Sequence, residues 1–336
     1  MSDAITTAGP RPPAGAPEPE RPPPVVWDAE QRPFLVFFVF LAILVAVLWP
    51  SAVLWLLRAA GFFNWFYPVE PTYVEARQHL WGLVLAFPFQ VATILVLAFA
   101  VLDARPSALG LHGRRGGRNL LVGLASAAIL TPVVLYLHLA VVWLHIHGFN
   151  VVEEKHPLAL AGKMHLTPVE WAVWFFAAVV AAPVVEELLF RGVFQPAAGR
   201  TRWGGLVGVA LSGAVAGLFR YRQIADSLQL LRDAGSSTAA LAFLDATSPL
   251  LFVAVLVPVH LLVQWRARDR VAPAVLGTSV LFAMVHVSVW PSPVALFVLA
   301  LGLGWLKELS GSLVGPIVLH ALFNGASCAL VILGVK

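Results

Sequence analysis

Charged residues are scarce in this sequence, and their scarcity excludes a water-soluble domain. Asp, Glu, Lys and Arg make up 12% of the 336 residues, whereas hydrophobic residues make up 59%. Soluble domains typically contain about 25% charged and about 45–50% apolar residues. A chain with half of the usual charge cannot cover a folded core with a water-compatible surface. We therefore predict an integral membrane protein.

Three further absences narrow the range of functions. The single cysteine, Cys328, lies in an apolar segment, which excludes a disulfide framework and a thiolate zinc cluster. No HExxH motif is present, so residue spacing gives no positive support to zinc, although imidazoles and carboxylates also suit this ion. The sequence also lacks the internal repeat that would indicate a transporter built from two related halves. The formal net charge is only +4, and arginines at segment ends favour topology signals over nucleic-acid binding.

Long apolar segments are what the sequence has instead. A membrane-spanning helix needs about 20 mostly apolar residues. We predict an all-α, polytopic transmembrane helical bundle with about nine membrane segments, at residues 34–57, 80–102, 119–146, 169–195, 204–219, 249–265, 271–288, 293–306 and 313–335. Residues 1–33 are rich in Pro, Ala and Glu and lack the apolar core of a signal peptide. We interpret them as a disordered cytoplasmic tail.

The loops between these segments suggest an orientation. With the N-terminus inside, thirteen Lys or Arg residues fall on the inner side and eight on the outer side, which favours a cytoplasmic N-terminus. Trp203 and Trp265 are among the tryptophans at segment edges, where an interfacial belt is expected. Residues 220–248 form the one sizeable polar stretch late in the chain, which we interpret as a surface helix followed by a loop. Small residues that suit close helix packing recur at Gly204, Gly208, Gly213 and Gly217.

Three charges stand inside the fourth segment, in the stretch VVEELLFRG. A charge in lipid costs several kcal/mol unless it is paired or hydrated. Residues four apart share a helix face, so Glu187 and Arg191 are natural ion-pair partners, whereas Glu186 points elsewhere. One glutamate is then neutralised and the other is available. The alternative is that all three form a purely structural salt-bridge cluster.

Two later segments carry polar pairs at the same spacing. Phe282 and His286 share a face in LFAMVHVSVW, and His320 and Asn324 share a face in VLHALFNG. An unpaired carboxylate and a histidine can polarise a water molecule, while His and Asn can donate hydrogen bonds to a carbonyl oxygen. Those groups suffice to hydrolyse an amide without a covalent intermediate. They also suit interhelical hydrogen bonding or a metal ion.

The sequence resembles the CPBP family, which contains the type II CAAX prenyl proteases and related bacteriocin-processing or immunity-linked membrane proteins. The family pattern EExxxR, FxxxH and HxxxN is found here as EELLFR, FAMVH and HALFN, in that order and on separate segments. The resemblance implies that Glu186 and His286 activate water, that His320 and Asn324 stabilise the oxyanion, and that the remaining motif residues are supporting: Glu187, Arg191 and Phe282. It implies a glutamate-dependent mechanism without a metal or other cofactor, with zinc as the alternative.

The chain departs from the family pattern by an insertion. About 70 residues, from about 200 to 270, separate the first two motifs, where the family generally has a short loop. Two added spans cross and return, whereas one would invert the following helix, so we expect an even number of extra crossings. This divides the chain into a tail at 1–33, N-terminal transmembrane helices at 34–168 and a catalytic membrane core at 169–335. The insertion is a candidate lateral wall, partner-binding element or substrate gate.

The leading functional hypothesis is an intramembrane endopeptidase that cleaves a membrane-associated peptide or protein near the cytoplasmic face. A non-catalytic scaffold or immunity-type protein of the same fold and a transporter are the alternatives, because buried Glu and His also build ion pathways. A composition rich in Ala, Val, Leu, Gly and Arg favours a bacterial inner membrane, where a prenylated substrate is not expected. At 1.5 Å per residue, His286 lies near 20 Å from the inner side and Glu186 near 13 Å, a mismatch in depth.

Overall fold

The described part of the protein is helical. The structure is a computed structural model that describes residues 48–67, 73–101, 105–111, 115–149 and 164–333. Those residues contain no β-strand, which confirms the all-α class. The predicted tail at 1–33 and the first part of the segment predicted at 34–57 lie outside the described residues, while residues 48–59 are helical.

Among the residues that the structure describes, seven helices are long and apolar enough to cross a membrane, which confirms a polytopic bundle. They are Val74–Phe99, Gly116–Phe149, Pro168–Ala198, Gly204–Ala234, Ser237–Arg266, Ser292–Ser310 and Val314–Ile332. The first begins with α3 (Val74–Val96) and continues into the π-helical η2 (Leu97–Val101), and the second is α4 (Gly116–Phe149). The last two are α12 (Ser292–Ser310) and α13 (Val314–Ile332). A short helix, α2 (Phe62–Phe66), precedes them.

The helix α11 (Val271–Met284) is shorter than a typical span and lies inside the bundle. Every residue from 273 to 284 is buried. A helix that is apolar on all sides is stable only when other helices surround it. α11 contacts α9, α10, α12 and α8, so it forms the centre of the C-terminal half.

Small residues bring α9 and α11 close together. A Cβ atom on Gly208 would lie 2.8 Å from the carbonyl oxygen of Gly277, and one on Gly277 would collide with the backbone of Gly205. The predicted small-residue face therefore packs closely against α11 at Gly208. It does not form a close helix contact along its whole length, because a Cβ on Gly217 would meet no atom within 4 Å.

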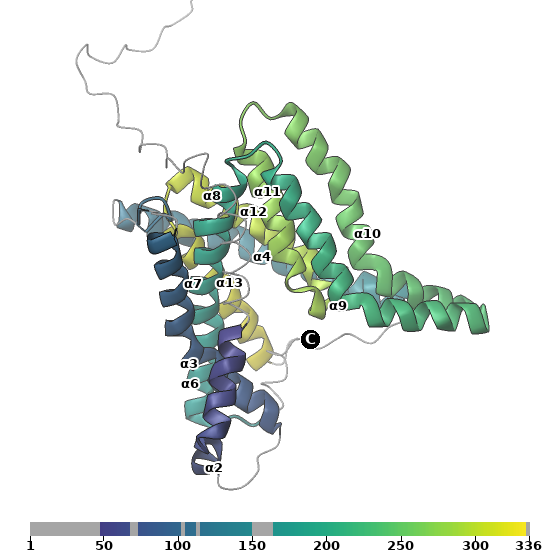
Figure 1. The fold of residues 1–336 in the computed structure, drawn as a ribbon, viewed down its shortest axis with the longest axis horizontal. Helices are drawn as coiled ribbons and strands as arrows, with labels where there is room; N and C mark the ends of the chain where they lie inside the picture. Colours follow the sequence, from purple (N-terminus) through teal and green to yellow (C-terminus); the bar gives the residue numbers. More distant parts are fainter. Residues whose placement is uncertain (1–47, 68–72, 102–104, 112–114, 150–163, 334–336) are drawn as a thin grey trace, which may run out of the picture.

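The insertion is a long helical hairpin made of α9 (Gly204–Ala234) and α10 (Ser237–Arg266). Its two helices pack on each other, and the tip projects away from the remaining helices (Figure 1). The prediction of a surface helix followed by a loop at 220–248 was wrong, because α9 and α10 both run through this stretch. Gly235 adopts φ 56°, a left-handed conformation that ends α9, and the Ser236 side chain caps α10 by accepting a hydrogen bond from the Ala239 N–H. Both helices are long and apolar enough to cross a membrane, and an even number of extra crossings stays a prediction.

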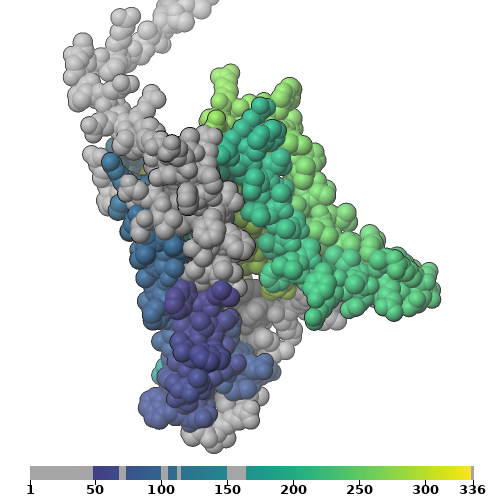
Figure 2. All heavy atoms as spheres, in the orientation of Figure 1, coloured from purple at the N-terminus to yellow at the C-terminus, as the bar shows by residue number. Residues whose placement is uncertain are grey.

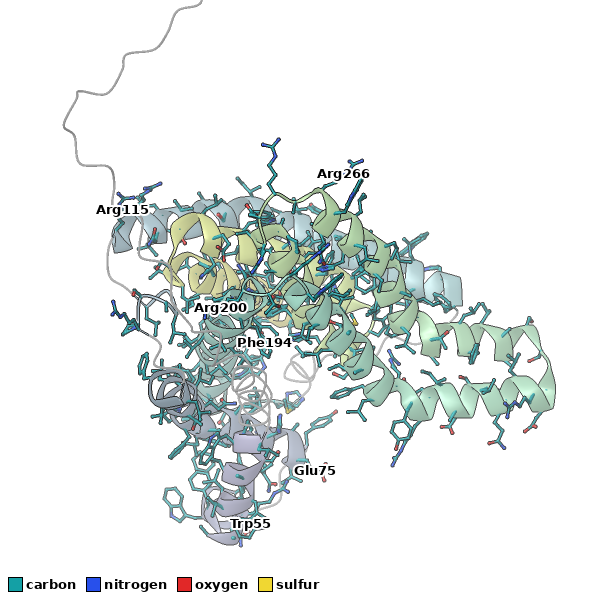
Figure 3. All side chains as sticks on the ribbon, turned by 45° about the horizontal axis from the view of Figure 1, so that its top comes forward. Trp55, Glu75, Arg115, Phe194, Arg200 and Arg266 are labelled. Carbon is teal, nitrogen blue, oxygen red and sulfur yellow. The ribbon has the colours of Figure 1, made fainter. Side chains whose placement is uncertain are left out.

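Figures 2 and 3 show where the hairpin and several labelled side chains lie relative to the rest of the molecule. The hairpin protrudes beyond the main body (Figure 2). Arg115 and Arg266 lie toward one end of the molecule, Arg200 lies nearer its middle, and Trp55 and Glu75 lie toward the other end (Figure 3). Two of the arginines that were assigned to the inner side from the sequence, Arg115 and Arg266, thus lie toward the same end.

Arg77 is an exception to the predicted loop charges. It was counted among the outer loops, but it lies inside α3 and is buried. Its guanidinium bonds the carboxylate of Glu170 and the carbonyl of Met164, and Tyr67 donates to the same carboxylate. Glu170 also completes a capping box with Thr167, at the start of the helix that carries the first motif. This cluster joins α3 to that helix, and the sequence spacing gave no sign of it.

Candidate active site

The first motif lies on an irregular helix. Between Pro168 and Ala198 the chain forms α6 (Pro168–Phe176), the π-helical η3 (Ala177–Ala181), α7 (Ala182–Glu187), the π-helical η4 (Leu188–Phe194) and α8 (Gln195–Ala198). π-helical turns are rare and occur mostly at functional sites. Here they stand on both sides of the turn that carries Glu186 and Glu187.

Pro183 explains a contact made by the third motif. In a π-helix each N–H bonds the carbonyl five residues earlier, as the Ala182 N–H does with the Ala177 carbonyl. The next donor in this series would be residue 183, but proline has no N–H. The Ala178 carbonyl instead accepts a hydrogen bond from Nδ2 of Asn324 at 2.8 Å. Asn324 therefore fastens α13 to the motif helix with one of its two N–H groups.

Glu187 is fully buried and has two polar partners. Arg191 Nη1 lies 2.9 Å from its Oε1 atom, which agrees with the pairing expected from helical spacing. Nδ1 of His320 lies 2.8 Å from the same oxygen, a contact between distant helices that spacing did not predict. Arg191 Nη2 also donates to the Ala300 carbonyl at 3.2 Å, so the guanidinium bridges the motif helix and α12.

Glu186 faces the Nε2 atoms of the two histidines and makes no contact with Arg191 comparable to that of Glu187. Its Oε2 atom lies 3.9 Å from Nε2 of His286 and 3.9 Å from Nε2 of His320. Both distances are too long for a direct hydrogen bond. The Glu186 and His286 side chains are each 25% exposed, whereas Glu187 is inaccessible. The structure thus brings together three of the predicted catalytic side chains from separate parts of the chain.

His286 lies just beyond a helix end, which corrects the predicted segment 271–288. α11 ends at Met284, and the chain continues into a 3-10 turn, η5 (Val287–Val289). His286 Nδ1 is 2.9 Å from the Phe282 carbonyl, an acceptor, so Nδ1 is the donor in this bond and Nε2 is the ring nitrogen that faces Glu186. The motif helix extends twelve residues beyond Glu186, to Ala198. Because Glu186 Oε2 and His286 Nε2 are only 3.9 Å apart, the two residues lie at the same level and the predicted mismatch is absent.

Phe282 packs beneath the charged groups. Its ring is buried, lies 4.4 Å from the guanidinium carbon of Arg191 and makes an edge contact with the His320 ring at 5.7 Å. A cation over an aromatic face is attracted by the ring quadrupole. Phe282 thereby restrains both partners of Glu187, consistent with a supporting position.

Glu186, His286 and His320 are of the residue types that bind zinc. Among the side chains that the structure describes, no three His, Cys, Asp or Glu residues have the mutual geometry of a metal site.

The geometry defines a class of protein: a polytopic helical membrane protein with a carboxylate and two histidines gathered inside the bundle. Residues 168–257 and 250–326 match the family model described as Type II CAAX prenyl endopeptidase Rce1-like. All three motifs fall within those ranges. This match, over just under half of the chain, confirms the resemblance to the CPBP family that the three motifs indicated. Comparison with curated proteins and with solved structures returns no match.

Proposed function

We propose that the protein is an intramembrane endopeptidase in which Glu186 and His286 activate a water molecule. The observation that carries this proposal is the 3.9 Å separation of Glu186 Oε2 from the Nε2 atoms of both histidines. A gap of this length between polar groups fits one bridging water. Such a water would donate one hydrogen to Glu186 and the other to the lone pair of His286.

The reaction follows from these positions. Glu186 accepts a proton as the water oxygen attacks the carbonyl carbon of the substrate peptide, and the carbonyl oxygen becomes an oxyanion. The C–N bond then breaks as the proton passes to the leaving amine, which gives a carboxylic acid and an amine. His320 and the second N–H of Asn324 are the proposed oxyanion donors.

Charge balance supports the role of His320. Its Nδ1 donates to Glu187, so a second proton on Nε2 is needed for it to donate to an oxyanion. With His320 protonated, two positive groups, Arg191 and His320, face two negative ones, Glu186 and Glu187. The buried cluster then carries no net charge, which avoids the cost of an isolated charge in the membrane.

Zinc is the alternative cofactor, and Glu186, His286 and His320 are the side chains that would approach it. Zinc requires donors at about 2.0–2.2 Å in a tetrahedral arrangement. Since the described side chains do not form such a group, we derive no step through a metal. Metal analysis of purified active protein, together with activity after chelator treatment, separates the two mechanisms.

We also propose that the N-terminus is cytoplasmic, that the site opens toward the cytoplasmic face and that the membrane is a bacterial inner membrane. The position of Arg115 and Arg266 toward the same end supports the orientation. Cysteine-accessibility labelling of single-cysteine variants in intact cells tests this orientation.

The catalytic proposal is tested by trapping a substrate on the Glu186→Gln variant and identifying it by mass spectrometry. Cleavage of that substrate by purified protein is then compared among variants. We expect Glu186→Gln and His286→Ala to abolish cleavage, and Glu75→Gln, which changes an exposed glutamate of α3 outside the three motifs, to leave it unchanged. Wild-type cleavage by the Glu186→Gln variant would refute the mechanism. A cellular phenotype rescued equally by Glu186→Ala would favour a scaffold.

A further inference from the structure

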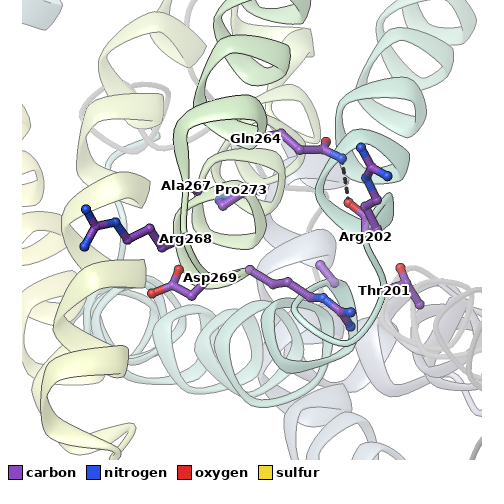
Figure 4. A pocket seen from close by; sticks show the side chains of 9 residues that line it. Thr201, Arg202, Gln264, Ala267, Arg268, Asp269 and Pro273 are labelled. Atoms are coloured by element: carbon purple, nitrogen blue, oxygen red, sulfur yellow. Dashed lines mark hydrogen bonds between the residues drawn. The ribbon is translucent and has the colours of Figure 1, made fainter.

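The two junctions between the insertion and the core meet around a cavity. The chain enters the hairpin through residues 199–203 and leaves it through residues 267–270. Arg270 Nη1 donates to the Arg200 carbonyl, and Gln264 Nε2 donates to the Arg202 carbonyl at 2.8 Å (Figure 4). A cavity of about 330 Å³ lies between these stretches.

The cavity is strongly basic. Arg202, Arg268 and Arg270 line it, together with Thr201, Gln264 and a single acid, Asp269. The Asp269 carboxylate already accepts the Val271 N–H at 3.0 Å, at the start of α11. Guanidinium groups offer planar pairs of donors that match the oxygens of phosphate. Three lining arginines against one aspartate therefore favour a phosphate-bearing anion.

Flanking arginines strengthen the field around the cavity. Arg200 lies within the first junction and Arg266 is the residue just before the second, so five arginines and one aspartate lie in or next to the two junctions. Burial lowers the pKa of Arg200 to about 10, so its guanidinium is still a cation at neutral pH. The junctions thus carry a net charge of about +4, from five positive and one negative side chain.

Two tryptophans indicate where the cavity lies relative to a bilayer. Trp203 and Trp265 are 51% and 79% exposed, and they lie beneath the guanidinium groups of Arg202 and Arg266. Tryptophan is enriched at the level of lipid headgroups. Beyond each tryptophan the helix surface becomes exposed and apolar, with Val207, Leu211, Leu261 and Leu262. A phosphate held in the cavity would have hydrocarbon-compatible surface directly beside it.

We propose that this cavity binds the phosphate of an anionic phospholipid headgroup, whose acyl chains lie along the exposed apolar faces of α9 and α10. The net positive charge favours a lipid with net negative charge over a zwitterionic one. The bound lipid connects the two junctions and so fixes the base of the inserted hairpin to the core. This site is separate from the Glu186 cluster, and the inference does not depend on proteolysis.

The test uses the full-length protein, purified and delipidated in a neutral detergent. Binding is measured by native mass spectrometry and by the shift in thermal unfolding, with phosphatidylglycerol, phosphatidylcholine of the same acyl chains, and inorganic phosphate. We expect adducts and stabilisation with phosphatidylglycerol, and little of either with phosphatidylcholine. Equal stabilisation by inorganic phosphate at matched concentration would identify a soluble anion as ligand and overturn the lipid assignment.

Variants locate the site. Arg202→Gln and Arg268→Gln are each expected to weaken phosphatidylglycerol binding about tenfold, because each removes a charge-assisted contact to phosphate. Arg268→Lys is expected to retain part of it. Arg232→Gln, an exposed arginine near the hairpin tip, removes the same charge and is expected to bind normally. Equal weakening in Arg232→Gln, or unchanged binding in the folded Arg202→Gln and Arg268→Gln variants, would overturn the proposal.

Discussion

The adjacent glutamates of α7 are expected to respond in opposite ways to the same change, replacement by glutamine. Glu187 is inaccessible, and its Oε1 atom lies within hydrogen-bond distance of both Arg191 and His320. Glu186 is 25% exposed, and its Oε2 atom has no hydrogen-bond partner. We therefore expect Glu187→Gln to destabilise the fold and Glu186→Gln to leave it nearly unchanged while abolishing cleavage.

The magnitude follows from what each substitution leaves behind. Glu187→Gln replaces the carboxylate by a neutral amide, so the buried Arg191 guanidinium loses its paired charge and is left with neutral contacts such as the Ala300 carbonyl at 3.2 Å and the Phe282 ring at 4.4 Å. Removing one partner of a buried ion pair typically costs about 3–5 kcal/mol, since the other charge stays in a medium of low polarity. For Glu186→Gln we expect a change below about 1 kcal/mol, because its carboxylate makes no hydrogen bond and its side chain is 25% exposed, so solvent can compensate for the lost charge.

The assay is unfolding in detergent, followed by tryptophan fluorescence and compared with the wild type at one protein and detergent concentration. The double variant Glu187→Gln/Arg191→Met removes both charges and is expected to recover part of the lost stability, which separates an uncompensated charge from poor packing. If Glu187→Gln unfolded at the wild-type midpoint, the buried pair would not hold the site together. A loss in Glu186→Gln as large as in Glu187→Gln would show that the two residues are not functionally distinct.

Three other predictions address the surrounding structure. Gly277→Leu is expected to lower the free energy of unfolding by at least about 1–3 kcal/mol, because α9 leaves no room for a side chain there. Gly217→Leu points into open space and is expected to be tolerated, and thermal unfolding of both variants tests the difference. Asn324→Leu is expected to cost about 1–3 kcal/mol by leaving the Ala178 carbonyl without its donor, and full wild-type stability would contradict that role. Burial and then a hydrogen bond to a carboxylate of α6 raise the pKa of Tyr67 to about 12, so its contribution to stability is present below pH 10 and lost as the pH rises through 12. The difference in unfolding midpoint between wild type and Tyr67→Phe should shrink over that interval, and a constant difference would argue against it.

Local rules determined much of this protein from its sequence. The scarcity of charge predicted a membrane protein, and the apolar segments predicted a helical bundle of about nine segments. The pairing of Glu187 with Arg191 also followed from sequence, because two residues four apart on a helix share a face whatever surrounds them. The order of the three motifs identified the family.

Contacts between helices were decided only by the tertiary structure. The sequence could not show that His320 is hydrogen-bonded to Glu187 or that His286 lies beyond the end of α11. Nor could it show that Asn324 donates to the Ala178 carbonyl, which Pro183 leaves without a backbone donor. Each additional helical residue rotates a side chain by about 100° and moves it 1.5 Å, so small differences in where helices end and how they pack change which groups meet. The same limit hid the long hairpin in residues 220–248, whose polar surface resembles that of a loop. Pairing within one helix is therefore fixed by helix geometry, whereas the position of Glu186 between two histidines depends on the packing of three separate segments.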